Sequence, residues 1–314
     1  MPGFFIEKFF CFRMRVCLAY VIVILLWSTT PLAIKWSGEG PGFLFGATAR
    51  MVIGAGGILL ALAGSRKRLP WHKSALMTYL AVALQIYGSM MTVYWGAQFI
   101  PSGWISVLFG LTPLMTALLA VYCLGERNLS LGRFLAYFFG IAGLGVMFGS
   151  ALQSGRNAVM GITAVIIAAL LQSLSAVWIK YINAGLPALV QVAGGLLFAL
   201  PAYLLTWAVA DGHWPILLPP ISVASILYLG IVATTFGFVL YYYLLTRLEA
   251  TQVALITLVS PVLALLLGRT VNQEPLTFRV LAGSLLILSA LVLHEYFDRV
   301  VGLKRVVSNG KSRH

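Results

Sequence analysis

The segments YWGAQFIPSGWISVLFGLTPLMTALLAVYCLGE, residues 94–126, and YYLLTRLEATQVALITLVSPVLALLLGRTVNQE, residues 242–274, align without a gap at an offset of 148 residues. Thr112-Pro113 in the first segment matches Ser260-Pro261 in the second, and each segment ends on a glutamate 13 residues after its proline. Few positions are identical, but the shared register predicts that the chain contains an internal duplication.

The composition determines the environment in which this duplication folds. Of the 314 residues, 61% are hydrophobic and 9% are charged, whereas soluble proteins have about 45–50% apolar and 25% charged residues. So few charges exclude both a water-soluble globular domain and a disordered chain. Three cysteines without a C-x-x-C spacing predict neither a disulfide framework nor a zinc site.

The apolar residues form segments long enough to cross a bilayer, which requires about 20 residues in a helix. We expect ten spans at approximately residues 16–36, 42–64, 74–97, 102–124, 131–150, 158–182, 187–209, 221–245, 250–271 and 278–297. Basic residues precede the first span, but it is too long for a secretory signal and we expect a permanent helix. The predicted units are an N-terminal tail (1–14), two five-helix copies (15–150 and 151–298) and a basic tail (299–314).

The basic residues predict the orientation of these spans. With the N-terminus in the cytoplasm, 16 basic residues lie on the inside and four, Lys35, Arg156, Arg269 and Arg279, lie on the outside. The positive-inside rule therefore places both termini in the cytoplasm. We expect the chain in the cytoplasmic (inner or plasma) membrane. The basic residues behind the net charge of +13 are expected to set the orientation of the chain and to contact anionic lipid. We therefore expect membrane lipid and no nucleic acid as a partner.

A second pair of segments supports the duplication. WSTTPLAIKW, residues 27–36, resembles QSLSAVWIKY, residues 172–181, at an offset of 145 residues. Five spans per copy is an odd number, so the two copies cross the membrane in opposite directions as an inverted repeat. Lys35 and Glu274 then lie at the outer face, while Lys180 and Glu126 lie at the inner face.

These features together resemble a known family. An aromatic pair ahead of a Ser/Thr-Pro helix, a glutamate-ended turn and two five-helix copies are similar to the EamA-type branch of the drug/metabolite transporter superfamily. The resemblance covers about residues 15–297. It implies an all-α basket of ten membrane helices around a central cavity that opens alternately to each side. It also implies the export of small amphipathic metabolites, and the chain looks nearest to amino-acid and metabolite exporters.

Arg50 lies well inside the apolar stretch of the second expected span, away from the ends where the other basic residues lie. A charge at the bilayer centre costs at least about 2.5–3.5 kcal/mol on insertion scales, so such a residue normally faces a cavity or a partner. A carboxylate-bearing substrate would suit it. The alternative is that Arg50 lies near the outer interface and extends toward the lipid head groups.

Aromatic side chains are candidates for binding the apolar part of a substrate. Trp27, Tyr87, Tyr94, Trp95 and Trp178 all lie within expected spans. Their rings can stack on an apolar group or attract a cation. The alternatives are an interfacial aromatic belt, which fits Trp178 near a span end, and simple core packing.

Polar residues and prolines complete the candidate site. Gln85 and Gln172 have two donors and one acceptor oxygen each, which favours a position at the cavity. Gln85, Ser89 and Thr92 recur at helical spacing, so they predict one polar face, although serines and threonines also join helices to one another. Pro113 and Pro261 are expected inside helices as gating bends, with a static bend as the alternative.

Missing motifs limit the function further. The eight acidic residues lie in expected loops, tails or span ends, and H-E-x-x-H, P-loop and G-x-S-x-G motifs are absent. We therefore expect a secondary transporter of a small molecule, with no catalytic residues, cofactor or metal. A multidrug or quaternary-ammonium exporter and a membrane-embedded enzyme or scaffold are the alternatives. A monomer and a homodimer both stay open.

Overall fold

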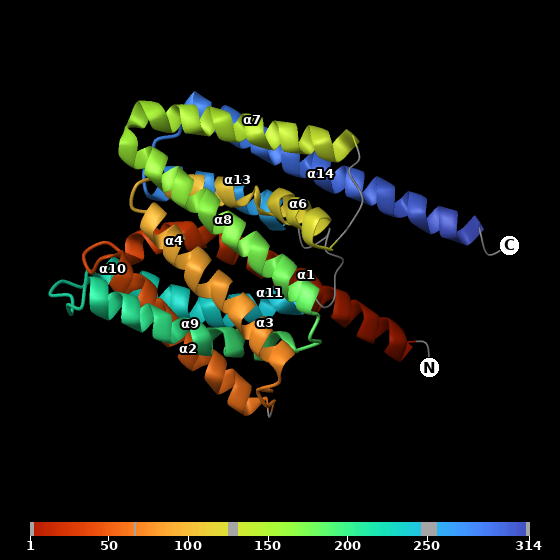
Figure 1. The fold of residues 1–314 in the computed structure, drawn as a ribbon, viewed down its shortest axis with the longest axis horizontal. Coiled ribbons are helices and arrows are strands. Elements are labelled where there is room, and N and C mark those ends of the chain that lie inside the picture. The colour runs from red at the N-terminus through yellow and green to blue at the C-terminus, as the bar shows by residue number, and fades with distance from the viewer. Residues whose placement is uncertain (1–2, 66, 125–130, 246–255, 312–314) are drawn as a thin grey trace.

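The computed structural model describes residues 3–65, 67–124, 131–245 and 256–311, and this part of the chain is helical without a strand. Figure 1 shows the helices as one bundle. The helices of the first half are α1 (Gly3–Ser37), α2 (Phe43–Gly64), α3 (Lys73–Ala83), η1 (Leu84–Ser89), α4 (Met90–Gly96), α5 (Ser102–Phe109), α6 (Thr112–Leu124) and α7 (Leu131–Ser154).

The second half contributes the remaining elements. These are α8 (Arg156–Ile182), α9 (Ala188–Ala210), α10 (Pro220–Leu227), η2 (Tyr228–Phe236), α11 (Gly237–Leu245), α13 (Ile256–Val271) and α14 (Phe278–Lys311). The two elements η1 and η2 are π-helical and continue directly into their α-helical neighbours. Each therefore widens one long helix rather than ending it.

Eight described helices are long and apolar enough to cross a membrane. They coincide within a few residues with the first eight expected spans, which are thereby confirmed as long apolar helices. Two shorter apolar stretches, Val259–Val271 and Phe278–Leu293, lie where the ninth and tenth spans are expected. The structure does not describe Glu126, Arg247 or residues 250–255, which form the expected start of the ninth span.

The outer surface of the bundle is apolar. Large hydrophobic side chains project outward from several helices, for example Leu60 on α2 (76% exposed) and Val209 on α9 (79% exposed). A water-soluble monomer rarely exposes contiguous apolar surface on this scale. The surface therefore suits contact with lipid chains.

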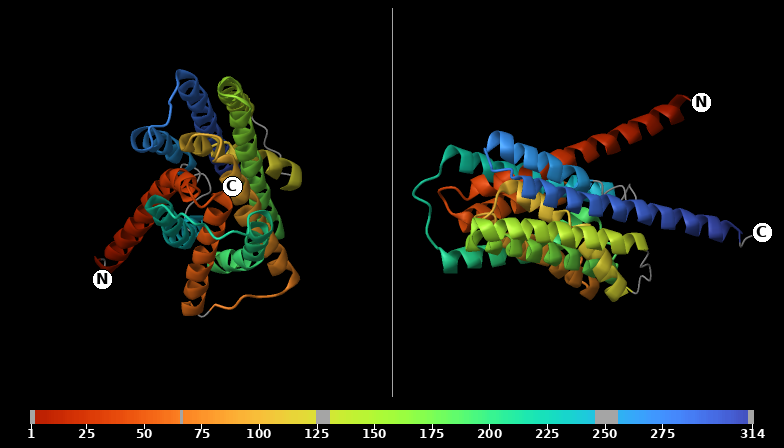
Figure 2. Two further views of the ribbon diagram at one scale, coloured as in Figure 1. Left: turned by 90° about the vertical axis from the view of Figure 1, so that its left-hand side faces the viewer. Right: turned by 90° about the horizontal axis from the view of Figure 1, so that it is seen from above.

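The helices of the two halves pack against each other throughout the bundle. α7 and α14 lie side by side (Figure 1), and they cross where Gly143 meets Gly283. A Cβ atom on Gly143 would lie 2.7 Å from the carbonyl oxygen of Gly283, so only glycine permits this approach. The first residues of α1 and the last residues of α14 project from the same end of the bundle (Figure 2).

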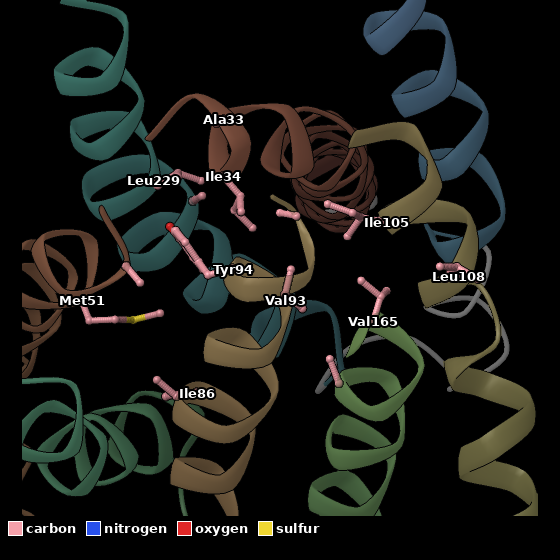
Figure 3. Close-up of a cluster of buried hydrophobic side chains, with 14 of the residues drawn as sticks. Ala33, Ile34, Met51, Ile86, Val93, Tyr94, Ile105, Leu108, Val165 and Leu229 are labelled. Atoms are coloured by element: carbon pink, nitrogen blue, oxygen red, sulfur yellow. The ribbon is translucent and has the colours of Figure 1, made fainter. Parts of the chain in front are cut away.

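The core is apolar and is crossed by hydrogen bonds from polar side chains. Figure 3 shows part of the buried cluster, with Tyr94 at its centre. Ser89 donates to the carbonyl oxygen of Ala168 at 2.8 Å, and Tyr203 donates to that of Ile86 in η1 at 2.7 Å. Such bonds join helices and satisfy backbone groups that a π-helical segment leaves partly free.

Candidate functional site

A cavity of about 140 Å³ lies among the helices of both halves. Its polar lining consists of Thr30, Arg50, Gln85, Ser106, Thr112, Gln172 and Ser260. Its aromatic lining consists of Trp27, Phe109, Phe238 and Tyr241. The other lining residues are Pro31, Ile34, Met90, Val93, Ile105, Gly110, Ala233 and Pro261. A small cavity that combines polar and aromatic walls is typical of a small-molecule site.

Arg50 on α2 is the charged residue of this lining. Its side chain is buried, with 3% exposure, and its Nε donates a hydrogen bond to Thr234 Oγ1 at 3.0 Å. Its Nη1 has no hydrogen-bond partner, and the ring centroid of Tyr94 lies 6.0 Å from its Cζ. Among the described residues, no carboxylate forms an ion pair with Arg50. Arg50 therefore brings a positive charge to the cavity wall and has one buried donor without a partner, a combination that favours an anion as ligand.

Close packing of α2 against η2 positions Arg50. A Cβ atom on Gly54 would lie 2.9 Å from the Cβ of Thr234, and one on Gly230 would lie 3.1 Å from the carbonyl oxygen of Arg50. Neither position has room for a side chain. The two helices can therefore approach until Thr234 reaches the guanidinium.

Neutral polar groups face the same cavity. Gln85 comes from η1 and Gln172 from α8, and neither amide forms a hydrogen bond with another residue in the described part of the chain. The hydroxyl of Thr112 is buried without a partner, while its backbone carbonyl accepts a bond from Ser173 at 3.1 Å. These groups can donate to and accept from a bound molecule.

Two of the aromatic side chains in the lining lie against each other. Trp27 of α1 and Tyr241 of α11 are tilted by 36° with their ring centroids 4.8 Å apart. Both lie at the cavity wall. The pair provides a surface against which a ring or an aliphatic chain can pack.

Four of the aromatic residues proposed from the sequence are not part of the cavity lining. Tyr87 forms a 2.5 Å hydrogen bond with Thr206, and Tyr94 is buried beside Arg50. Trp95 packs against Phe99, with ring centroids 5.1 Å apart. Trp178 lies half-buried on α8. The structure thus brings Trp27, Arg50, Gln85 and Gln172 together and leaves these four outside.

The two prolines differ in position. Pro261 lies within α13 and lines the cavity. Pro113 is the second residue of α6, because the chain leaves the helix between Phe109 and Thr112. At a helix start the missing N–H removes no intrahelical bond, so Pro113 fits a helix that begins anew rather than one that bends.

Some lining residues were not among the site residues predicted from the sequence, notably Thr112, Ser260 and Tyr241. A signal for two of them was present, since Thr112 and Ser260 are the Ser/Thr residues of the matched Ser/Thr-Pro pairs. Equivalent positions of an inverted repeat meet at its central site. Tyr241 carries no such signal, because Val93 is its counterpart at an offset of 148.

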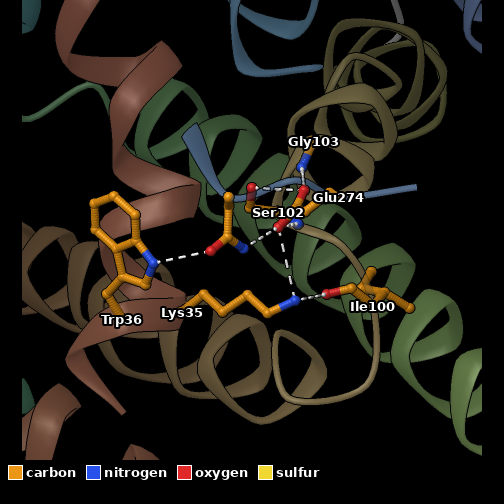
Figure 4. A network of polar contacts seen from close by, with 7 residues as sticks. Lys35, Trp36, Ile100, Ser102, Gly103 and Glu274 are labelled. Carbon is orange, nitrogen blue, oxygen red and sulfur yellow. Dashed lines mark hydrogen bonds and ion pairs between the residues drawn. The ribbon is translucent and has the colours of Figure 1, made fainter. Parts of the chain in front are cut away.

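A polar network joins α1, the N-terminus of α5 and the segment after α13 (Figure 4). Glu274 accepts hydrogen bonds from the backbone N–H groups of Ser102 and Gly103 at 2.9 and 3.3 Å, and from the Ser102 hydroxyl at 3.0 Å. Lys35 Nζ lies 3.7 Å from the same carboxylate. The Asn272 amide donates to it at 3.0 Å. The negative charge thus caps the N-terminus of α5, where the helix dipole stabilises it.

Known proteins resemble this chain over most of its length. The EamA-like transporter family matches residues 14–149 and 159–294. The uncharacterized transporter YoaV of Bacillus subtilis is 27% identical and aligns with 90% of this chain and 97% of its own length. A protein of Streptantibioticus cattleyicolor named "Probable terminal-alkyne amino-acid exporter" is 25% identical over 92% of this chain and 96% of its own.

A third relative and a solved structure agree with these matches. A Salmonella typhimurium protein named "Probable amino-acid metabolite efflux pump" is 26% identical over 74% of this chain and 81% of its own. One crystal structure superimposes with a TM-score of 0.64 and 22% identity, covering 92% of this chain and 99% of that chain. That structure establishes the similarity of the fold.

Proposed function

Because the chain belongs to the EamA-like transporter family, we propose that it is a secondary transporter that exports small amphipathic metabolites such as amino acids. It is an integral membrane protein, with eight helices long and apolar enough to span a bilayer. The observation that carries the proposal is the cavity among these helices, which contains a buried arginine with an unpartnered nitrogen. In a membrane protein, an ionisable group in such a position marks a substrate pathway.

The proposed mechanism is alternating access by an inverted repeat of ten spans. The helix contacts support it, because equivalent pairs recur with the two halves exchanged. In the third span α3 packs on α9 of the seventh span, and in the eighth span η2 packs on α2 of the second. In the same way α6 packs on α8, and α13 packs on α1. Both the third and the eighth span contain a π-helical segment, η1 and η2. Two halves of similar structure can rock about a central site and open it to either face.

The network around Glu274 serves as a closed outer gate in this mechanism. On α1 and α5 the cavity lining ends at Ile34 and Ile105, and Lys35 and Gly103 of the network follow within one helical turn. The orientation expected from the basic residues places this end outside, with both termini in the cytoplasm. Opening outward requires these contacts to break, and Pro261 weakens α13 where that helix lines the cavity.

A multidrug or quaternary-ammonium exporter is the second candidate within transport. The tilted pair of Trp27 and Tyr241 favours it, because aromatic faces attract organic cations. Arg50 in the same lining opposes it, because a buried positive charge repels a cation. A membrane-embedded enzyme or scaffold has less support, since the names of the relatives indicate transport.

Flux across a membrane tests the proposed function. Purified protein is reconstituted in liposomes loaded with an unlabelled amino acid or an amphipathic carboxylate, and uptake of the same labelled compound is followed. We expect transient accumulation of chemically unchanged label above that in protein-free liposomes. Absence of accumulation across a panel of both classes would overturn the transporter proposal. Chemical conversion of the label would support an enzyme instead.

A further inference from the structure

We infer that the cavity selects a carboxylate and does not require an amino group, so that its preferred occupants are small amphipathic monocarboxylates whose nitrogen is absent or acylated. This inference rests on the proposed function, because it takes the cavity as the transport site. It goes further by separating N-acylated amino acids and deaminated analogues from free amino acids.

The first step is the charge of the lining. Within the described part of the chain, Arg50 is the one formally charged side chain at the cavity, and no acidic residue lines it. A carboxylate can accept from the free Nη1 in a charge-assisted hydrogen bond. An ammonium group finds no negative partner and is repelled by the same guanidinium. In a free amino acid the carboxylate therefore raises the affinity for the cavity and the ammonium lowers it.

The second step is the neutral polar lining. Gln85 and Gln172 each offer an amide with both donors and an acceptor, and Thr112 offers a buried hydroxyl without a partner. These are the groups that match a secondary amide, which donates through N–H and accepts through C=O. An acylated nitrogen thus pairs with the lining without bringing a second positive charge near Arg50.

The third step is the apolar part of the occupant. Trp27 and Tyr241 form a ring surface at the wall, and Phe109 and Phe238 add to it. The volume of about 140 Å³ is close to that of an engineered apolar cavity of about 150 Å³ that holds benzene. A ring or a branched aliphatic group alone takes up that volume, so an occupant that also carries a carboxylate or an amide requires the walls of the cavity to move apart as it binds.

Four phenyl compounds separate the contributions of the carboxylate, the ammonium and the amide in a binding experiment. 3-Phenylpropionate carries the carboxylate alone, phenylalanine adds an ammonium, N-acetylphenylalanine replaces it with an amide, and phenethylamine carries the ammonium alone. Titration calorimetry on the purified protein is expected to show N-acetylphenylalanine and 3-phenylpropionate binding at least tenfold more tightly than phenylalanine. Phenethylamine is expected to show no binding. If phenylalanine binds more tightly than 3-phenylpropionate and N-acetylphenylalanine, or if phenethylamine binds at all, the inference is overturned.

A charge placed in the cavity should reverse the order. Gln85→Glu adds a carboxylate to the lining that contains Arg50, so the affinity for N-acetylphenylalanine should fall at least tenfold and phenethylamine binding should become measurable. Gln153→Glu adds the same charge on an exposed position of α7 and should leave all four affinities unchanged. Gel filtration and thermal unfolding show whether Gln85→Glu is folded. If a folded Gln85→Glu protein keeps the wild-type order, the inference is wrong.

The proposed function and this inference fail in different ways. If the binding order holds but none of the four compounds crosses the membrane in proteoliposomes, the inference stands and transport is disproved. If phenethylamine or another organic cation is transported while the carboxylates are not, transport stands and the inference is overturned.

Discussion

The protein contains two cations in contrasting surroundings, Arg50 at the cavity and Lys35 at its end. Lys35 lies 3.7 Å from Glu274 and 3.4 Å from the carbonyl oxygen of Ile100, so its charge already has partners. Arg50 is more deeply buried, yet its Nη1 has no partner. A buried charge without a partner is costly in a folded chain, and a ligand that supplies the partner recovers that cost. We therefore propose that Arg50 binds the substrate and that the network of Lys35 closes the cavity.

The largest effect is expected from breaking the site at Arg50. Arg50→Gln removes the charge, and loss of a hydrogen bond between charged groups should weaken carboxylate binding roughly 10- to 150-fold. Arg50→Lys keeps the charge but not the planar donor set, so it should retain part of the affinity. Titration with N-acetylphenylalanine measures both variants. Equal affinity of Arg50→Gln and the wild type would remove Arg50 from the site.

The next effect concerns the network at the end of the cavity. Glu274→Gln removes the charge that caps α5 and should lower the free energy of unfolding by about 1.5–3 kcal/mol. Lys35→Met removes a partly exposed partner and should cost about 1 kcal/mol or less. Thermal unfolding in detergent measures this order. If Lys35→Met lowers the free energy of unfolding more than Glu274→Gln does, the cap on α5 is not the main stabilising contact of the network.

The same pair of variants also tests the gate. A cysteine at Ser106, which lines the cavity, is introduced into a chain whose own three cysteines are replaced by serine. A membrane-impermeant maleimide applied from outside should label this cysteine faster in Glu274→Gln than in Lys35→Met, and slowest with the network intact. Equal labelling rates in all three would argue against a gate.

A smaller effect is expected from the residue that orients Arg50. Thr234→Val removes the acceptor 3.0 Å from Nε without a change in size. The guanidinium keeps its charge but loses one positioning bond, so carboxylate affinity should fall roughly two- to tenfold. An effect as large as that of Arg50→Gln would mean that Thr234 contacts the substrate itself.

The smallest effect on binding is expected at Tyr87, outside the cavity. Tyr87→Phe breaks the bond to Thr206 and should lower the free energy of unfolding by about 0.5–1.5 kcal/mol. Carboxylate affinity should change less than twofold. A loss of affinity comparable to that of Thr234→Val would return Tyr87 to the binding site.

Hydropathy was enough to place the first eight spans, because a bilayer requires long apolar segments whatever their packing. The faces of those spans were harder to predict. Gln85 and Ser89 share a face in a regular α-helix, but residues 84–89 are π-helical. In the structure Gln85 faces the cavity while Ser89 bonds to Ala168 on α8. A change of helical register cannot be recognised from the spacing of polar residues alone.

Contacts between segments far apart in the sequence are the second feature that could not be predicted from the sequence. Lys35 and Glu274 are 239 positions apart in sequence, and the sequence predicts only that both lie at the outer face. That their charges meet at the N-terminus of α5 depends on how α1, α5 and the segment between α13 and α14 converge. Arg50 was recognisable because a charge in an apolar segment is conspicuous, whereas its bond to Thr234 requires the close approach of α2 and η2.

Counterflow of labelled N-acetylphenylalanine into proteoliposomes tests the central claim, transport of a carboxylate through a site formed by Arg50, most directly. The wild-type protein is compared with Arg50→Gln, and Gln153→Glu serves as the control. The account predicts accumulation by the wild type and the control and none by Arg50→Gln at the same substrate concentration. Equal accumulation by Arg50→Gln, or none by the wild type, would contradict it.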